Sequence, residues 1–113
     1  MSGYKELEIY KEAFNLALEV HKTSLQLPKF ELYEQGSQIR RASKSIKDQI
    51  VEGYGRRNYK ADLIKFLIYA KASCDETKGQ LEMIRELYDG TSNWDKLIED
   101  YNTLGKKLNK FIK

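Results

Sequence analysis

Apolar side chains recur every three or four residues along most of the chain, which is the spacing of one face of an α-helix. Pro28, the glycines at 53 and 55, and the adjacent Asp89 and Gly90 divide this pattern into four segments. The segments predict helices over residues 7–27, from about 34–38 to 54, over 60–88, and from residue 94 to the end. Four helices with short connections predict an all-α, antiparallel up-down-up-down four-helix bundle.

Each segment has a predicted core-facing stripe. The first is formed by Tyr10, Ala13, Phe14, Ala17, Val20, His21 and Ser24. The second is formed by Ile39, Ala42, Ile46, Ile50 and Gly53. The third runs through Leu63, Phe66, Leu67, Ala70, Cys74, Thr77, Leu81, Ile84 and Leu87 or Tyr88, and the fourth through Trp94, Leu97, Ile98, Tyr101, Leu104, Gly105, Leu108, Phe111 and Ile112. The middle of the third segment is rich in small residues, so we expect it to approach the second segment closely, near Ala42, Ser43 and Ile46.

Some apolar residues fall outside these stripes. In the first segment they are Leu7, Ile9, Leu16, Leu18 and Leu25, and in the third they are Ile64 and Ile68, with Tyr69 nearby. An apolar surface wider than one contact requires indicates burial against a second surface. We therefore expect the protein to associate with copies of itself.

The connections carry their own signals. Residues 29–36 are expected to fold Phe30, Leu32 and Tyr33 back over one end of the bundle. Gly53 and Gly55 are expected to mark the exit of the second helix, with Asn58 as a candidate cap for the third. Residues 89–93 predict a turn, in which Ser92 or Asn93 caps the last helix.

Composition narrows the class of protein. With 113 residues, 41% of them hydrophobic, the chain suits a single domain over residues 1–113 with a real core. No apolar run reaches the roughly 18 residues of a membrane span, and the N-terminal residues are too charged for a secretory signal, so we expect a cytoplasmic protein without membrane contact. The single Cys74 excludes an intramolecular disulfide and is expected to be a small buried hydrophobe.

Charge is unevenly distributed around the second helix. Residues 38–60 contain only two acidic side chains, Asp48 and Glu52, against seven basic ones: Arg40, Arg41, Lys44, Lys47, Arg56, Arg57 and Lys60. Guanidinium groups match phosphate oxygens, and Tyr54 and Tyr59 could stack on bases. The basic residues are thus a candidate RNA or DNA interface that recognises phosphates rather than sequence.

The same basic residues have an alternative interpretation. Exposed helix faces are usually charged, and arginines can pair with carboxylates of neighbouring helices or subunits. Glu52 lies near a helix C-terminus, where the dipole disfavours an anion, and a structural ion pair with Arg56 is predicted, with Arg41 a further candidate for such pairing. Under this hypothesis the protein is an interaction scaffold that binds no nucleic acid.

Few residues in the sequence support a catalytic role for this protein. A di-iron bundle needs a Glu-x-x-His pair on each of two helices, whereas this chain has one histidine, His21, expected in the core or at its rim. Cys74 lies on a core stripe, where burial makes a thiol inert, and the glycines near residues 53–57 lack the spacing of a phosphate-binding loop. We expect a protein that is not an enzyme, with no metal and no cofactor.

Three stretches carry a resemblance to a known family. They are SQIRRASKSIKDQIVEGYGRR at residues 37–57, FLIYAKASCDETKGQLEMIREL at 66–87, and YKELEIYKEAFNLALEVHKTSLQLPK at 4–29. Together they resemble the four-helix bundle proteins known as 23S rRNA intervening-sequence proteins. The most specific positions are 38–42, 45–46, 50–53 and Arg56. The family often has a proline-containing segment before its Glu-Gly pair, and this chain has Lys47, Asp48 and Gln49 there, so a more regular helix is expected.

The resemblance implies more than the residues do. It implies an antiparallel four-helix bundle that assembles into a ring-shaped homopentamer, without enzymatic activity or cofactor. Similar bundles are accessory proteins of diversity-generating retroelements, which implies nucleic acid and a reverse transcriptase as partners.

Overall fold

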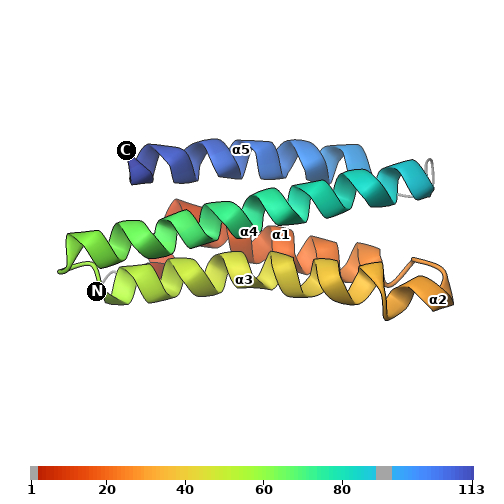
Figure 1. The fold of residues 1–113 in the computed structure, drawn as a ribbon, viewed down its shortest axis with the longest axis horizontal. Helices are drawn as coiled ribbons and strands as arrows, with labels where there is room; N and C mark the ends of the chain where they lie inside the picture. The colour runs from red at the N-terminus through yellow and green to blue at the C-terminus, as the bar shows by residue number, and fades with distance from the viewer. Residues whose placement is uncertain (1–2, 89–92) are drawn as a thin grey trace.

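The amphipathic segments form helices close to their predicted bounds. The computed structural model describes residues 3–88 and 93–113, and its long helices are α1 (Glu8–Ser24), α3 (Gln35–Gly55), α4 (Lys60–Leu87) and α5 (Trp94–Ile112) (Figure 1). A short 3-10 turn, η1 (Tyr4–Glu6), precedes α1, and a single turn of helix, α2 (Lys29–Leu32), follows it. Within the described residues no strand is present. The expectation of an unbroken second helix is met, since α3 runs without interruption past residues 47–49.

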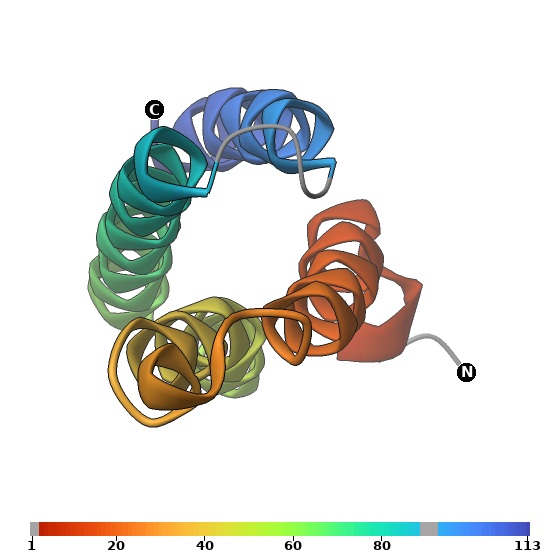
Figure 2. The same cartoon turned by 90° about the vertical axis from the view of Figure 1, so that its right-hand side faces the viewer.

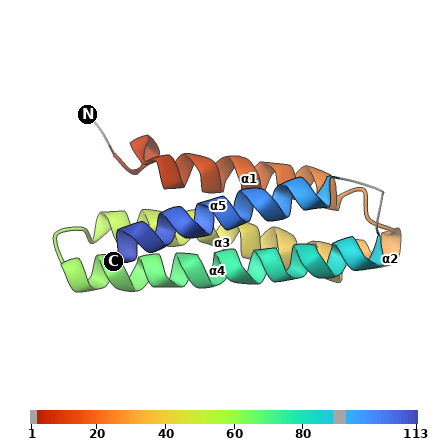
Figure 3. The same ribbon diagram turned by 90° about the horizontal axis from the view of Figure 1, so that it is seen from above.

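The long helices alternate in direction, and both chain ends lie at the same end of the molecule (Figure 1). Seen along the bundle, α1, α3, α4 and α5 follow one another around a common centre (Figure 2). From above, α1 and α4 lie on opposite sides (Figure 3). The predicted all-α, antiparallel four-helix bundle is therefore confirmed. This order makes α3 the neighbour of both α1 and α4.

The bundle centre is one continuous apolar core. The predicted stripe of α3 is confirmed, because Ile39, Ile46 and Ile50 are at most 1% exposed. From α5, Leu104 and Leu108 are fully buried. Burying an aliphatic side chain of this size stabilises the fold by about 1.5–3 kcal/mol, so the core supplies the main driving force for folding.

Close approach of α3 and α4 is also confirmed. The side-chain oxygens of Ser45 and Ser73 lie 2.9 Å apart and share a hydrogen bond. Two such short side chains meet only when the helix backbones are near each other. Gly53 provides a second contact, because a Cβ atom there would lie 3.2 Å from the Cβ of Phe66.

Two details of the predicted stripes are wrong. In α1, Ile9 is only 2% exposed whereas Phe14 is 39% exposed, so the inward face is rotated relative to the prediction. The reason is that α1 packs between α3 and α5 and turns its buried side toward both. In α5, Phe111 is 52% exposed, although Ile112 beside it packs on the core as predicted. At the end of α4 the alternative left open between Leu87 and Tyr88 is resolved in favour of Tyr88, which packs on the core and donates its hydroxyl to Glu31 Oε2 at 2.8 Å.

The predicted aromatic lid over the bundle end is wrong as well. Phe30 and Tyr33 are 72% and 81% exposed, and only Leu32 packs against the core. A helix as short as α2 can direct only one side chain of the three inward. The exposed aromatics at this corner are therefore surface features.

The predicted helix ends are partly corrected. Gly53 lies inside α3, and the helix continues to Gly55. The role of Gly53 is in packing, because a Cβ atom at this position would crowd Phe66 on α4. The N-cap position of α4 is Tyr59, not Asn58, and its side chain makes no capping hydrogen bond. Asn93 occupies the N-cap position of α5, also without a side-chain cap, and residues 89–92 of the predicted turn, Ser92 included, lie outside the described residues.

Candidate nucleic-acid interface

The seven basic residues lie on α3, on the turn that follows it and at the start of α4, but they occupy different environments. Some use their charge within the fold, and others present it to solvent. This division decides which of them can meet an external phosphate.

Arg40 is part of the fold. Its guanidinium donates one hydrogen bond to Ser24 Oγ at 2.9 Å and another to the carbonyl oxygen of Leu32 at 2.8 Å. Ser24 is completely buried at the end of α1. The arginine therefore connects α1, α2 and α3. Gly36 makes room for it, since a Cβ atom there would lie 2.9 Å from the guanidinium.

Arg56 is neutralised by two carboxylates. Its Nε donates to Glu52 Oε2 at 2.9 Å, and its NH1 lies 3.4 Å from Asp62 Oδ2. The pKa of Arg56 is raised, first by the hydrogen bond that it donates to Glu52. The predicted Glu52–Arg56 ion pair is confirmed. Because this cluster is about half exposed, it adds little to the stability of the fold. It does neutralise Arg56, so Arg56 is not among the cations that are available to a phosphate.

Lys47 is the third residue with an internal partner. Its ammonium lies 2.7 Å from Asp48 Oδ1. Adjacent residues on a helix point in different directions, and a pair of this kind is easily exchanged for another anion. Lys47 therefore keeps part of its capacity to meet a ligand.

Four cations remain. The exposed residues Arg41, Lys44, Arg57 and Lys60 make no ion pair with any residue in the ranges 3–88 and 93–113. The expected pairing of Arg41 with Glu52 is thus not present. Arg57 is held against Tyr54, with its guanidinium carbon 4.3 Å from the ring centroid and a 3.0 Å hydrogen bond to the Tyr54 carbonyl.

These cations form two groups along the molecule. Arg41 and Lys44 lie in the middle of α3, whereas Arg57 and Lys60 lie beyond its C-terminal end. At 1.5 Å per residue, the stretch from residue 41 to the end of α3 measures about 20 Å. Successive phosphates of one duplex strand lie about 3.4 Å apart along the axis, so the two groups span roughly six nucleotides.

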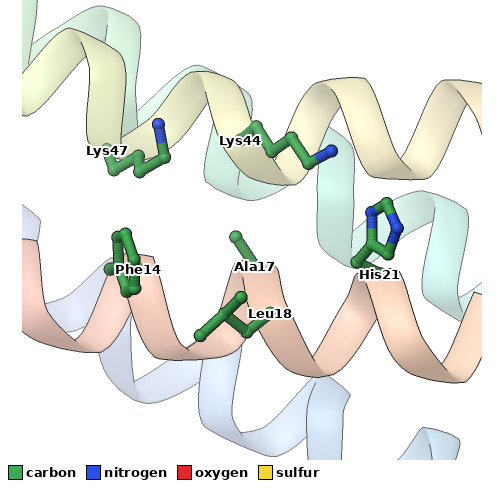
Figure 4. Close-up of a pocket in the computed structure, with 6 residues that line it drawn as sticks. All are labelled: Phe14, Ala17, Leu18, His21, Lys44 and Lys47. Carbon is green, nitrogen blue, oxygen red and sulfur yellow. The ribbon is translucent and has the colours of Figure 1, made fainter.

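An apolar groove flanks the first group. It lies between α1 and α3, has a volume of about 290 Å³ and is lined by Phe14, Ala17, Leu18, His21, Lys44 and Lys47. In Figure 4 Phe14, Ala17 and His21 project from α1 toward α3, and Lys44 lies along α3 near His21. Phe14 and Leu18 are 39% and 46% exposed. Periodicity within one helix could not have revealed this groove, because its two walls come from different segments.

The pKa of His21 reflects the position of its side chain in this groove. Its pKa is lowered from the usual 6.5, first by desolvation and then by the positive charges of Lys44 and Arg40. The folded protein therefore resists protonation of His21. Stability contributed by the neutral ring is present above pH 6.5 and is lost as the pH falls below 6.5 toward the folded-state pKa.

An NMR titration tests this electrostatic coupling. The midpoint of His21 is expected below 6.5 in the native protein, and Lys44→Ala should raise it because one repelling charge is removed. Lys60→Ala is the matched control, because Lys60 lies at the opposite end of the bundle and should leave the midpoint unchanged. A native midpoint at or above 6.5 would contradict the assigned environment.

Neither a reactive cysteine nor a cluster of metal ligands is found among the described residues. Cys74 is 1% exposed, and burial raises the pKa of its thiol to about 11, so the sulfur stays protonated and unreactive near neutral pH. Within residues 3–88 and 93–113 no group of three or more His, Cys, Asp or Glu side chains is arranged to hold a metal ion. In that part of the chain no helix has the length and apolar character needed to cross a membrane.

Comparison with known proteins shows that the chain is similar to a known protein family. A family model described as 23S rRNA-intervening sequence protein matches residues 5–110, which is nearly the whole chain. No curated protein matches the chain.

Proposed function

The chain belongs to the 23S rRNA-intervening sequence protein family, and from this premise we propose that it is a non-enzymatic, oligomeric helical bundle that contacts RNA or DNA phosphates. The contacts are made by the unpaired cations Arg41, Lys44, Arg57 and Lys60. Arg40 is excluded from the interface because its hydrogen bonds hold the fold together. Recognition is of the backbone and independent of base sequence.

One observation carries this proposal. The four cations are exposed and have no carboxylate partner in the described residues, in contrast to Arg56, which has two. A face on which every cation served an internal ion pair would leave no such residue. Nucleic-acid phosphates would take the place of counterions along this face, and this would give the unpaired cations a function.

Self-association is the second part of the proposal. Exposed apolar side chains lie on two faces of the bundle, Phe14 and Leu18 on α1, and Ile68, Tyr69 and Met83 on α4. A homopentameric ring, which the family resemblance implies, would bury such surface and repeat the basic face several times. Repeated weak contacts with one polyanion strengthen binding through effective concentration.

Sedimentation velocity at micromolar concentration tests assembly. The expected result is a species several times heavier than the 13.3 kDa monomer. Phe14→Ser combined with Ile68→Ser should lower the mass, because both residues are exposed and their loss removes apolar surface without disturbing the core. A monomer alone in the unchanged protein would refute the oligomer.

The second candidate function is a protein-interaction scaffold without nucleic acid. It is favoured by the many basic residues that are already paired, including Lys107 with Glu8 at 3.0 Å and Glu12 at 2.8 Å. Here the four unpaired cations would meet acidic residues of another subunit or of a protein partner. A reverse transcriptase is the partner that the family resemblance implies.

Charge reversal separates the two functions. The variant Arg41→Glu/Lys44→Glu/Lys60→Glu should abolish measurable binding to single-stranded RNA or duplex DNA in an electrophoretic assay. In the single variants to methionine, the slope of log affinity against log salt should fall by roughly one per residue. Arg57 is left unchanged in this variant because it also lines a separate cavity at the end of the bundle.

The matched control is Lys106→Glu/Lys110→Glu/Lys113→Glu, on α5 and at the C-cap position that follows it. It makes the same change in net charge on lysines that also lack a partner among the described residues. Binding should survive in this control. Equal loss in both variants would show a general effect of net charge, and retained binding in the first variant would leave the scaffold as the better function.

A further inference from the structure

A second cavity lies at the end of the bundle where α1 and α4 begin and α3 and α5 end. Its volume is about 200 Å³, and its inner wall includes Ile9, Ile50 and Leu67, which are core residues 1–3% exposed. Leu63 and Phe111 also line it, and Phe111 is 52% exposed. The cavity therefore reaches from the surface to the apolar core.

The lining of this end cavity is almost entirely hydrocarbon. Water in such a space finds few hydrogen-bond partners, because a buried water normally needs two to four. An apolar guest would instead gain about 25 cal/mol for each Å² of apolar surface removed from water. The cavity thus favours a hydrocarbon occupant.

Arg57 supplies the polar feature. Among the residues that the structure describes, it is the only charged side chain that lines the end cavity. Its guanidinium is fixed beside Tyr54 by the 3.0 Å hydrogen bond to the carbonyl and by stacking on the ring at 4.3 Å. It has no carboxylate partner in the described residues, whereas the neighbouring Arg56 has Glu52 and Asp62. A fixed, uncompensated guanidinium is suited to a carboxylate, which it can bind with two parallel hydrogen bonds.

We propose that the end cavity binds a small amphiphilic carboxylate, with a hydrocarbon tail against Ile9, Ile50 and Leu67 and its head group on Arg57. At roughly 30 Å³ for each non-hydrogen atom, the share that water takes in the liquid, the cavity holds about seven such atoms. This corresponds to a short alkyl or single-ring tail. The site shares Arg57 with the proposed phosphate interface and lies apart from the other three cations, Arg41, Lys44 and Lys60.

Octanoate and octan-1-ol are suitable probes because they share a tail and differ in head group. Titration followed by NMR of the methyl groups should show saturable octanoate binding, with shifts concentrated on Ile9, Ile50, Leu63 and Leu67. Arg57→Met should weaken octanoate about tenfold and leave octan-1-ol unchanged, since only the carboxylate loses its partner. Arg41→Met is the matched control: it removes the same charge from the middle of α3, away from the end cavity, and should change neither affinity.

A cavity-filling variant provides the second arm. Leu63→Phe should weaken both probes, because the larger side chain occupies the tail site. If this variant does not fold, the methyl shifts in the unchanged protein still locate the probe. The triple variant Arg41→Glu/Lys44→Glu/Lys60→Glu should keep octanoate binding even though it loses nucleic acid, so the two proposals can fail separately.

Three results would overturn the proposal. One is the absence of saturable octanoate binding up to about 10 mM, a concentration at which even a weak specific site is occupied. Another is methyl shifts centred on the α1–α3 groove at Phe14 and Leu18 rather than on the end cavity. The third is an equal loss of affinity in Arg57→Met and Arg41→Met, which would indicate attraction by net charge alone.

Discussion

Replacing Arg40 with methionine is expected to lower the free energy of unfolding by about 2–3 kcal/mol, because two charge-assisted hydrogen bonds are lost. The carbonyl of Leu32 would lose its donor, and the buried Ser24 hydroxyl would lose a partner that comes from another helix. Methionine retains most of the hydrocarbon stem, so the packing is largely preserved. Urea denaturation followed by circular dichroism measures the change.

Arg41→Met is the control for this prediction. The two arginines are adjacent in sequence, yet Arg41 is exposed and has no ion pair with the described residues. Its removal should change stability by less than about 0.5 kcal/mol and weaken nucleic-acid binding, whereas Arg40→Met should destabilise the protein without changing the salt dependence of binding. The reverse pattern would show that the structural and interface roles had been exchanged.

Gly53→Val is expected to destabilise the protein by about 2–3 kcal/mol, because extra carbon atoms would overpack the contact between α3 and α4. Even a Cβ atom at Gly53 would lie 3.2 Å from Phe66 Cβ and 3.4 Å from the Leu63 carbonyl oxygen. The two branched methyl groups of valine extend further into this space. The midpoint of thermal unfolding and the urea denaturation curve should both report the loss.

Gly79→Ala is the comparison for this prediction, and it is expected to stabilise the protein. Nothing lies within 4 Å of a Cβ atom placed there, and the position is exposed in the middle of α4. Alanine should stabilise the helix by about 0.5–1 kcal/mol, since it restricts the unfolded chain and favours helix. If both glycine variants destabilised the protein equally, close approach at Gly53 would not explain its cost.

Much of the fold follows from periodicity. The stripe of Ile39, Ile46 and Ile50 predicts the inward face of α3, and the long repeat from Leu67 to Ile84 predicts α4. In α3 the apolar residues are few and regularly spaced, so only one orientation buries them. In α4 the stripe is long enough to set the inward face, although Ile68 and Tyr69 lie outside it and are exposed. In α1 apolar residues surround much of the helix, and Ile9 and Phe14 could not be ranked for burial without knowing that α3 and α5 pack on either side.

The candidate interface was less predictable than the fold. Local spacing identifies Glu52 and Arg56 as an i, i+4 pair, and this ion pair is present at 2.9 Å. Arg40 and Arg41 look alike in the sequence, but they lie about 100° apart around the helix, so one meets Ser24 and Leu32 and the other meets solvent. The end cavity beside Arg57 also escaped prediction, because its walls come from four separate segments.

Residue patterns alone predict the helical class, the order and approximate bounds of the helices, and the concentration of basic residues around α3. These properties depend on local periodicity and composition, which act within one segment. The packing of the helices is needed to see which of the seven basic residues lack a carboxylate partner among the described residues, where apolar surface remains exposed and where a cavity opens beside Arg57. Those properties depend on which helices become neighbours, because a charge is neutralised or left free by residues that are distant in sequence and adjacent only in the folded protein.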